Sequence, residues 1–336
     1  MSVIKNEEVL SPEYLPANLP HREGQIKLLA DNLSLLLKNK KPPNIFIHGK
    51  SGVGKTAVSK YVLREFENYS GIKSIYINCW QYNTTFAILS EIGLRINAFI
   101  SRRGWAKDEI FNRIIQQLEN QKINLIVVLD EVDQLIKRDQ SILYDLLRIE
   151  NYTKQKVGLV FISNDKFAFK DVEDRIKSSL NLEEIEFKPY TFLEMKDIVE
   201  DRLKNAFVAY ENGVSALVAS KAAEKGDVRI ALQILLKAGR RAKDKLTLED
   251  VKAVLREEME NPKEKASENF LSDKEKLLLS ILEKPKNTEQ LYEELLKNMK
   301  ISQSEFNRIV DELIKKNLVE VIGFENKFRI LSKRKI

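Results

Sequence analysis

The sequence predicts an α/β fold, in which a parallel sheet carries helices on both faces, followed by a helical domain and a C-terminal domain of three helices and a hairpin. Two observations support the main division. Four short apolar runs rich in β-branched residues alternate with helix-period segments between about residues 24 and 190. Beyond residue 191 the strand pattern stops, and only amphipathic helical segments continue to the polar stretch that holds Pro262.

The first domain is expected over residues 1–190. Its four strands are predicted at residues 44–49, 73–79, 124–130 and 157–163. These runs are continuously apolar rather than alternating, which is typical of strands that are buried on both faces. Helical segments lie between them, so the pattern indicates βαβ units.

The second domain is expected over residues 191–262 and to consist only of helices. Its first helix begins with Thr191 as a plausible N-cap, and Glu194 follows at the spacing of a capping box. Further helical segments run to about residue 260, where the polar stretch around Pro262 predicts a linker.

The third domain is expected over residues 263–336. Three helical patterns have Ser272, Thr288 and Ser302 near their starts, and two alternating runs around a short polar turn predict a hairpin. Three helices followed by a hairpin is a winged-helix pattern, whose third helix is the recognition helix. The residues of that helix expected in the core are Phe306, Ile309, Leu313 and Ile314.

Composition bounds the class of protein. The chain has 336 residues, 43% hydrophobic residues and a formal net charge of +6, which permits a polyanionic partner without demanding one. The single cysteine, Cys79, excludes a disulfide framework. No apolar run approaches the roughly 18 residues of a membrane span. We expect a soluble, cytoplasmic protein with no membrane partner.

A phosphate-binding motif follows the first predicted strand. The segment GKSGVGKT fits GxxxxGK[ST], and it opens a helical pattern, which is the context that this motif requires. Backbone N–H groups of such a loop hold phosphate oxygens, Lys55 is expected to reach the β- and γ-phosphates, and Thr56 to bind Mg²⁺. The expected cofactor-binding residues here are Gly49, Lys50, Ser51, Gly52, Val53, Gly54, Lys55, Thr56 and Ala57.

Polar residues also end the third and fourth predicted strands. Asp130 is placed to hold the nucleotide's Mg²⁺, and Glu131 to orient or deprotonate the attacking water. A solvated turn is the alternative for two adjacent carboxylates. Asn164 can hold the water against the γ-phosphate, and a turn-forming Asn-Asp pair is the alternative there.

Two arginines are candidates for contact with the nucleotide. Arg229, on a helix of the second domain, would let both domains sense the γ-phosphate if it reached across. The alternative is a surface arginine. Arg175 can similarly reach a phosphate, in its own chain or from a neighbouring subunit.

These motifs occur in a known order. The chain resembles archaeal replication initiators that are related to the eukaryotic origin-recognition and helicase-loading ATPases of the AAA+ superfamily. The resemblance implies an AAA+ P-loop ATPase core with a lid and a winged helix. It implies ATP or ADP with Mg²⁺ as cofactors, and slow ATP hydrolysis as a conformational switch. It also implies double-stranded DNA at replication origins as a partner, and therefore association with the nucleoid. Related initiator subunits and the replicative helicase are implied as further partners.

The resemblance assigns further roles. The segment EYLPANLPHREGQIKLLA resembles the family's adenine-packing element, and EEIEFKPYTFLEM resembles the segment that leads into the lid. Asn164 then falls at the first-sensor position, Arg229 at the second-sensor position, and Arg175 at the arginine finger. Asp174 stands where relatives commonly have a proline before that finger. The candidate adenine contacts are Leu15, Pro16, His21, Arg22 and Tyr190.

The family also inserts a helical hairpin after its second strand, and residues 80–118 fit that insertion. Relatives use this motif on DNA, which makes Arg102, Arg103 and Lys107 candidate DNA contacts. The alternative is an ordinary solvated helix surface.

Charge alone does not predict DNA binding by the third domain, because residues 267–336 hold 14 basic and 12 acidic side chains. Binding must come from arrangement. On the expected recognition helix, Asn307 and Arg308 can read base edges, while serines suit phosphate contacts or capping. The candidate contacts on the helix and the wing are Ser302, Gln303, Ser304, Asn307, Arg308, Lys327 and Arg329. Protein–protein contact is the alternative for this domain.

Two alternatives to an initiator remain. The wing turn GFENKF is poor in arginine, where relatives often have a basic, glycine-rich wing. Together with Asp174, this fits a divergent paralogue that acts as a sequence-specific repressor or transcriptional regulator. An ATPase signalling hub that uses its winged helix for protein contact would leave no site-specific DNA footprint.

Overall fold

The computed structural model describes residues 3–98, 105–260, 273–282, 285–298, 301–315, 319–325 and 328–333. The chain divides into two compact units, residues 1–254 and 255–336. Within the described residues, none of the helices is both long and apolar enough to cross a membrane.

The first unit is built on a five-stranded parallel sheet with the strand order β2-β3-β4-β1-β5. The strands are β1 (Asn44–Gly49), β2 (Lys73–Asn78), β3 (Leu125–Asp130), β4 (Val157–Ser163) and β5 (Leu182–Phe187). After β1 the chain crosses to β2 at one edge of the sheet, and β5 pairs with β1 at the opposite edge. Ligands of open α/β sheets bind outside the carboxyl ends of the strands at such a switch point.

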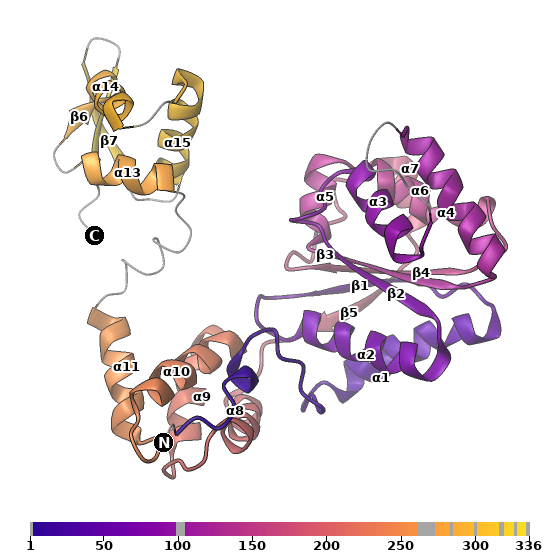
Figure 1. Ribbon diagram of the computed structural model, residues 1–336, viewed down its shortest axis with the longest axis horizontal. Coiled ribbons are helices and arrows are strands. Elements are labelled where there is room, and N and C mark those ends of the chain that lie inside the picture. Colours follow the sequence, from indigo (N-terminus) through magenta and orange to yellow (C-terminus); the bar gives the residue numbers. More distant parts are fainter. Residues whose placement is uncertain are drawn as a thin grey trace. The chain divides into compact units, whose positions relative to one another are not determined.

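The predicted α/β class is confirmed, with helices on both faces of the sheet (Figure 1). Alternate residues of β1 enter opposite layers, since Ile45 and Ile47 pack on the side of α1 and α2, and Phe46 packs on the other side. The helices of the first layer are α1 (Glu23–Leu33) and α2 (Lys55–Ser70), with η2 (Ser34–Lys38) after α1. The opposite layer holds α3 (Thr85–Arg95), α4 (Lys107–Gln121), α5 (Val132–Arg138), α6 (Ser141–Leu147), η3 (Ile149–Asn151) and α7 (Asp174–Leu180).

The fifth strand, β5, was not predicted. Its glutamates alternate with apolar residues, and of its side chains only Ile185 and Phe187 are buried. An edge strand needs few apolar residues, so it lacks the continuous run by which the other four strands were recognised.

The inserted helices α3 and α4 lie between β2 and β3, where the resemblance placed a helical hairpin. Thr84 caps α3 by accepting a hydrogen bond from the N–H of Ala87 at 3.3 Å. Both helices bury apolar residues, such as Ile88 and Ile114, in the same core as the sheet. The insertion is therefore anchored on the sheet by its own hydrophobic face.

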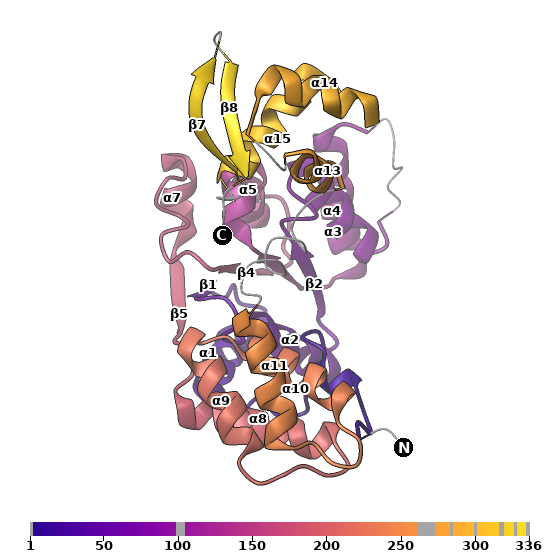
Figure 2. The ribbon, with the colours of Figure 1, turned by 90° about the vertical axis from the view of Figure 1, so that its left-hand side faces the viewer.

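Between β5 and residue 260, four helices follow the sheet, as the amphipathic pattern predicted: α8 (Phe192–Ala206), α9 (Val214–Lys225), α10 (Val228–Arg241) and α11 (Leu248–Glu260). The capping box of Thr191 and Glu194 is present. The N-terminal segment, with η1 (Glu8–Leu10), packs on these helices, because Lys5 N–H donates to the carbonyl of Ala206 at 2.8 Å. The described part of the N-terminal segment thus lies beside these helices (Figure 2).

The second unit contains the elements expected after the linker: α13 (Asp273–Ile281), β6 (Lys286–Asn287), α14 (Thr288–Asn298), α15 (Gln303–Lys315), β7 (Val319–Glu325) and β8 (Phe328–Lys333). The hairpin β7–β8 joins β6 in an antiparallel sheet. Ser302 caps α15, but α14 is capped by Asn287 rather than by Thr288. The core includes the predicted Phe306, Ile309 and Leu313, while Ser272 and the Ile314 side chain lie outside the described residues.

Candidate functional site

A cavity of about 460 Å³ lies at the carboxyl edge of the sheet. The phosphate loop, the ends of β2 and β3, the N-terminal segment and the helices α8 and α10 all contribute to its lining. The site is thus formed where the sheet meets the four-helix segment within the first unit.

The loop between β1 and α2 turns at glycines, among them the two that define the motif. Gly49 has φ 150° and Gly54 has φ 94°, both in the region that favours glycine. A Cβ on Gly49 would lie 2.3 Å from the carbonyl oxygen of Phe187, and one on Gly54 would lie 2.9 Å from the Tyr190 hydroxyl. The glycines of the motif are therefore required both for the turn and for the close packing around it.

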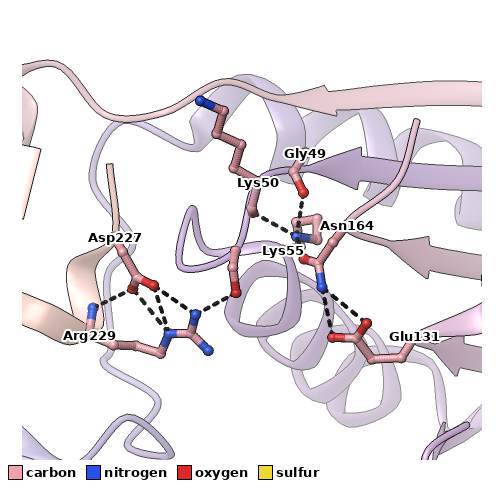
Figure 3. A network of polar contacts seen from close by, with 8 residues as sticks. Gly49, Lys50, Lys55, Glu131, Asn164, Asp227 and Arg229 are labelled. Atoms are coloured by element: carbon pink, nitrogen blue, oxygen red, sulfur yellow. Dashed lines mark hydrogen bonds and ion pairs between the residues drawn. The ribbon is translucent and has the colours of Figure 1, made fainter. Parts of the chain in front are cut away.

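Lys55, the first residue of α2, lies inside the loop with only 7% of its surface exposed. Its ammonium donates to the carbonyls of Gly49 and Lys50 at 2.8 Å each, and to Asn164 Oδ1 at 2.7 Å (Figure 3). Burial lowers the pKa of Lys55, and the nearby carboxylates of Asp130 and Glu131 oppose that shift. The loop thus surrounds a buried amine at the position where an anion would enter.

The carboxylate of Asp130 is held from three directions. Oδ2 accepts from Thr56 Oγ1 at 2.9 Å and also from the hydroxyl of Tyr76, while Oδ1 accepts from Glu131 N–H at 2.9 Å. Sequence reasoning missed Tyr76, which lies two residues before the end of β2. The register of β2 and β3, which pairs Asn78 with Asp130, brings the two strand ends together.

Glu131 and Asn164 face each other across the ends of β3 and β4. Asn164 Nδ2 donates to both carboxylate oxygens of Glu131, at 3.1 and 3.0 Å (Figure 3). Burial raises the pKa of Glu131, and the charges of Asp130 and Asp133 raise it further. Asn164 therefore joins Lys55 to Glu131 in one network.

Arg229 extends from α10 to the phosphate loop. Its guanidinium donates to Ser51 Oγ and to Asp227, at 2.7 Å from Asp227 Oδ2. Val228 N–H also donates to the carbonyl of Gly52 at 3.2 Å. The helical segment therefore contacts the loop through both backbone and side chains, and Figure 3 shows the side-chain contacts of Arg229.

The expected adenine-side residues separate into two groups. Pro16 and Tyr190 are among the described residues that line the cavity, whereas Leu15, His21 and Arg22 are not. His21 Nε2 lies 3.0 Å from Asp197 Oδ2. Arg22 is buried and directed at the loop backbone, where it donates to the carbonyl of Val53 from Nε at 3.1 Å and from Nη2 at 3.0 Å.

Arg175 lies away from the cavity lining, near the start of α7. It pairs with Glu173, and its guanidinium carbon lies 5.2 Å from the centre of the Tyr144 ring. Asp174, the residue before Arg175, lies 3.8 Å from Lys177. Within the described part of the chain, Arg175 is thus on a separate, exposed surface.

The candidate DNA contacts are described only in part. Lys107 pairs with Asp145 at 2.7 Å. On α15, Gln303, Asn307 and Arg308 are exposed, as is Ser302 before it. The positions that lie outside the described residues or side chains are Arg102, Arg103, Ser304, Lys327 and Arg329.

The polar groups that line the cavity fit a nucleoside triphosphate with Mg²⁺. Glycines open a backbone cradle around a buried ammonium, which is suited to phosphate oxygens. The Thr56 hydroxyl and the Asp130 carboxylate adjoin each other, and Mg²⁺ prefers such oxygen ligands. Lys55 would contact phosphates, while Thr56 and Asp130 would hold the cation.

Comparisons with known proteins agree with this geometry. The chain matches the AAA domain family over residues 38–168 and the Cdc6 AAA+ ATPase-type lid domain family over residues 196–254. It is 37% identical over 280 residues to the ORC1-type DNA replication protein 1 of Methanosarcina mazei, covering 76% of this chain and 68% of that protein. It is 40% identical over 255 residues to the ORC1-type DNA replication protein of Pyrococcus abyssi, covering 70% of this chain and 60% of that one.

Among solved structures, the Orc1 protein of Aeropyrum pernix in complex with DNA matches with a TM-score of 0.80 and 30% identity. That match covers 99% of this chain and 94% of the other. The Cdc6p structure from Pyrobaculum aerophilum matches with a TM-score of 0.69 at 22% identity, which supports the fold alone.

Proposed function

Since the chain belongs to the family of ORC1-type DNA replication proteins, as its resemblance implied, we propose that it is an ATP-dependent initiator that binds duplex DNA at replication origins. The observation that carries this proposal is the composition of the cavity. Lys55, Glu131 and Asn164 come from the sheet, while Arg229 reaches the same site from the four-helix segment. A nucleotide in the cavity would therefore contact two parts of the chain at once.

The residues of the sheet would carry out binding and hydrolysis. Lys55 would neutralise the β- and γ-phosphates, and Thr56 and Asp130 would hold Mg²⁺, which supplies charge neutralisation when it is bound. Glu131 would orient the attacking water and accept its proton, and Asn164 would position both the water and Glu131. Asn164 also accepts a hydrogen bond from Lys55. It would therefore couple the contact of Lys55 with phosphate to the orientation of the general base Glu131.

Arg229 would make the nucleotide a conformational switch. Its partners here are Ser51 of the loop and Asp227 of its own helix. A γ-phosphate near the loop would offer the guanidinium an additional anionic partner and so favour one arrangement of sheet and lid. Slow hydrolysis would then act as a timer that removes this partner, rather than as fuel for rapid turnover.

DNA recognition is assigned to the second unit and to the inserted helices. On α15, the exposed Gln303, Asn307 and Arg308 have the chemistry to read base edges, and Ser302 suits a phosphate or the helix cap that it forms. Support comes from the Aeropyrum pernix relative, whose structure is a complex with DNA. Related initiator subunits and the replicative helicase are proposed as further partners. The relatives' names lend no support to the alternative of a transcriptional regulator.

Footprinting on origin DNA and on a shuffled sequence of equal length tests this proposal. The wild-type chain should protect a defined site on origin DNA, and the pattern should differ between ATP and ADP. Lys55→Ala should bind no ATP, keep its second unit folded and show no nucleotide-dependent difference. Equal protection of the shuffled DNA, or normal ATP affinity in Lys55→Ala, would contradict the proposal.

A further inference from the structure

One oxygen atom of the Asp130 carboxylate, Oδ2, accepts hydrogen bonds from two hydroxyl groups. One comes from Thr56 of the phosphate loop, at 2.9 Å, and the other from Tyr76 of β2. We propose that Tyr76 is a positioning residue for the magnesium ion, because its hydroxyl fixes the carboxylate that holds this cation. The inference rests on the proposed nucleotide site and adds a residue to it.

The two hydroxyls lie on different elements. Thr56 is in the first turn of α2, directly after the phosphate loop, and is itself proposed to bind the cation. Tyr76 belongs to a strand that is paired along its length with β3, and its register partner is Val128. Tyr76 therefore orients Asp130 from a rigid element, whether or not a nucleotide is bound.

The Asp130 carboxylate has little other support. It is buried, with 6% of its surface exposed, and its second oxygen accepts from Glu131 N–H at 2.9 Å. Loss of the Tyr76 hydroxyl would leave Oδ2 with the Thr56 hydroxyl alone and let the carboxylate rotate. Groups that hydrogen-bond to metal-binding carboxylates commonly contribute about 10- to 100-fold to metal affinity.

The surroundings of Tyr76 direct its hydroxyl at the site. The ring packs in the core layer beside α2, and the Lys60 ammonium lies 5.1 Å from the ring centre. The hydroxyl side of the residue lines the cavity, so Tyr76 supplies a hydrogen bond at the cavity wall in addition to filling space.

Tyr76→Phe removes this hydroxyl and keeps the ring. The matched control is Tyr61→Phe, since Tyr61 packs in the same layer and its hydroxyl has no hydrogen-bonding partner among the described residues. Binding of fluorescent ADP is titrated with Mg²⁺ and is also measured in excess EDTA. Thermal melting checks that each variant is folded.

The Mg²⁺ concentration for half-maximal effect should rise at least about tenfold in Tyr76→Phe, while ADP affinity in EDTA stays within about twofold of wild type. Tyr61→Phe should match wild type in both. A parallel titration of Mn²⁺ into the ADP complex, followed by electron paramagnetic resonance, should show the same loss of cation affinity. An unchanged cation requirement, or an equal loss of ADP affinity in EDTA, would overturn the role of Tyr76. If the wild-type chain binds no nucleotide at all, the proposed function itself fails.

Discussion

The guanidinium carbon of Arg22 lies 3.7 Å from the centre of the Tyr190 ring, inside the protein rather than in the nucleotide cavity. The same side chain donates to the carbonyls of Val53, in the phosphate loop, and of Lys188, at 2.9 Å, in the connection between β5 and α8. Arg22 thus links the loop to the segment that leads into the helical part. Its buried charge is compensated by carbonyl oxygens and aromatic faces.

Arg22→Met should therefore destabilise the first unit by about 2–4 kcal/mol, because it removes several hydrogen bonds from a buried charged donor and leaves their carbonyls unpaired. Nucleotide affinity should fall as well, since Val53 would lose its support. Denaturant unfolding and ADP titration measure the two effects. Arg64→Met, which removes an exposed arginine paired with Glu65, is the control and should change stability by less than about 1 kcal/mol. Wild-type stability and affinity in Arg22→Met would show that the link has no role.

Glu131→Gln should retain ATP and stop its hydrolysis, because the amide keeps the shape of the side chain and one acceptor oxygen but cannot accept a proton. Asn164 Nδ2 would still donate to that oxygen. Equilibrium binding of labelled ATP and single-turnover hydrolysis separate the two properties. The exposed Glu224, which pairs with Lys221, provides the control variant Glu224→Gln. Unchanged turnover in Glu131→Gln would move the base to another residue.

The pH dependence of hydrolysis should report the pKa of Glu131. Burial and the neighbouring carboxylates raise that pKa above the usual glutamate value of about 4.3. The ionised form of Glu131 accepts the proton. The hydrolysis rate should therefore be maximal above the raised pKa and fall as the pH decreases through it. Single-turnover rates across the acidic to neutral range test this. A fall only at the ordinary glutamate pKa would contradict the raised value.

Arg308→Ala should weaken binding to the specific DNA site by roughly 1–3 kcal/mol and relax specificity at one position. The reason is that an arginine near the start of α15 can bond a base edge in two places. Competition binding with specific and shuffled duplexes measures the loss of affinity for each. Lys221→Ala on α9 is the control for the loss of one positive charge. Equal losses on both duplexes would make Arg308 a phosphate contact instead.

Much of the fold and of the candidate site follows from local sequence. Four strands were predicted because each is a continuous apolar run, and the loop was predicted because its glycines and Lys55 occupy neighbouring positions. Strand β5 was not predicted because only Ile185 and Phe187 of its side chains are buried. The sequence predicts a strand or a site residue only where a local pattern or a family motif marks it.

The contacts that sequence reasoning missed join residues far apart in the chain. Tyr76 meets Asp130 across 54 positions, and Arg22 meets Val53 across 31. No local pattern predicts these contacts, because they depend on strand register and on how the chain returns to the loop. The resemblance directed Arg22 to the adenine, whereas its hydrogen bonds are to backbone carbonyls.

Mapping of DNA bound to the chain across the genome of its own organism tests origin binding most directly. The proposed initiator should give peaks centred on replication origins, and Lys55→Ala should weaken or redistribute them. Peaks centred on promoters, with none at origins, would contradict an initiator and favour a transcriptional regulator.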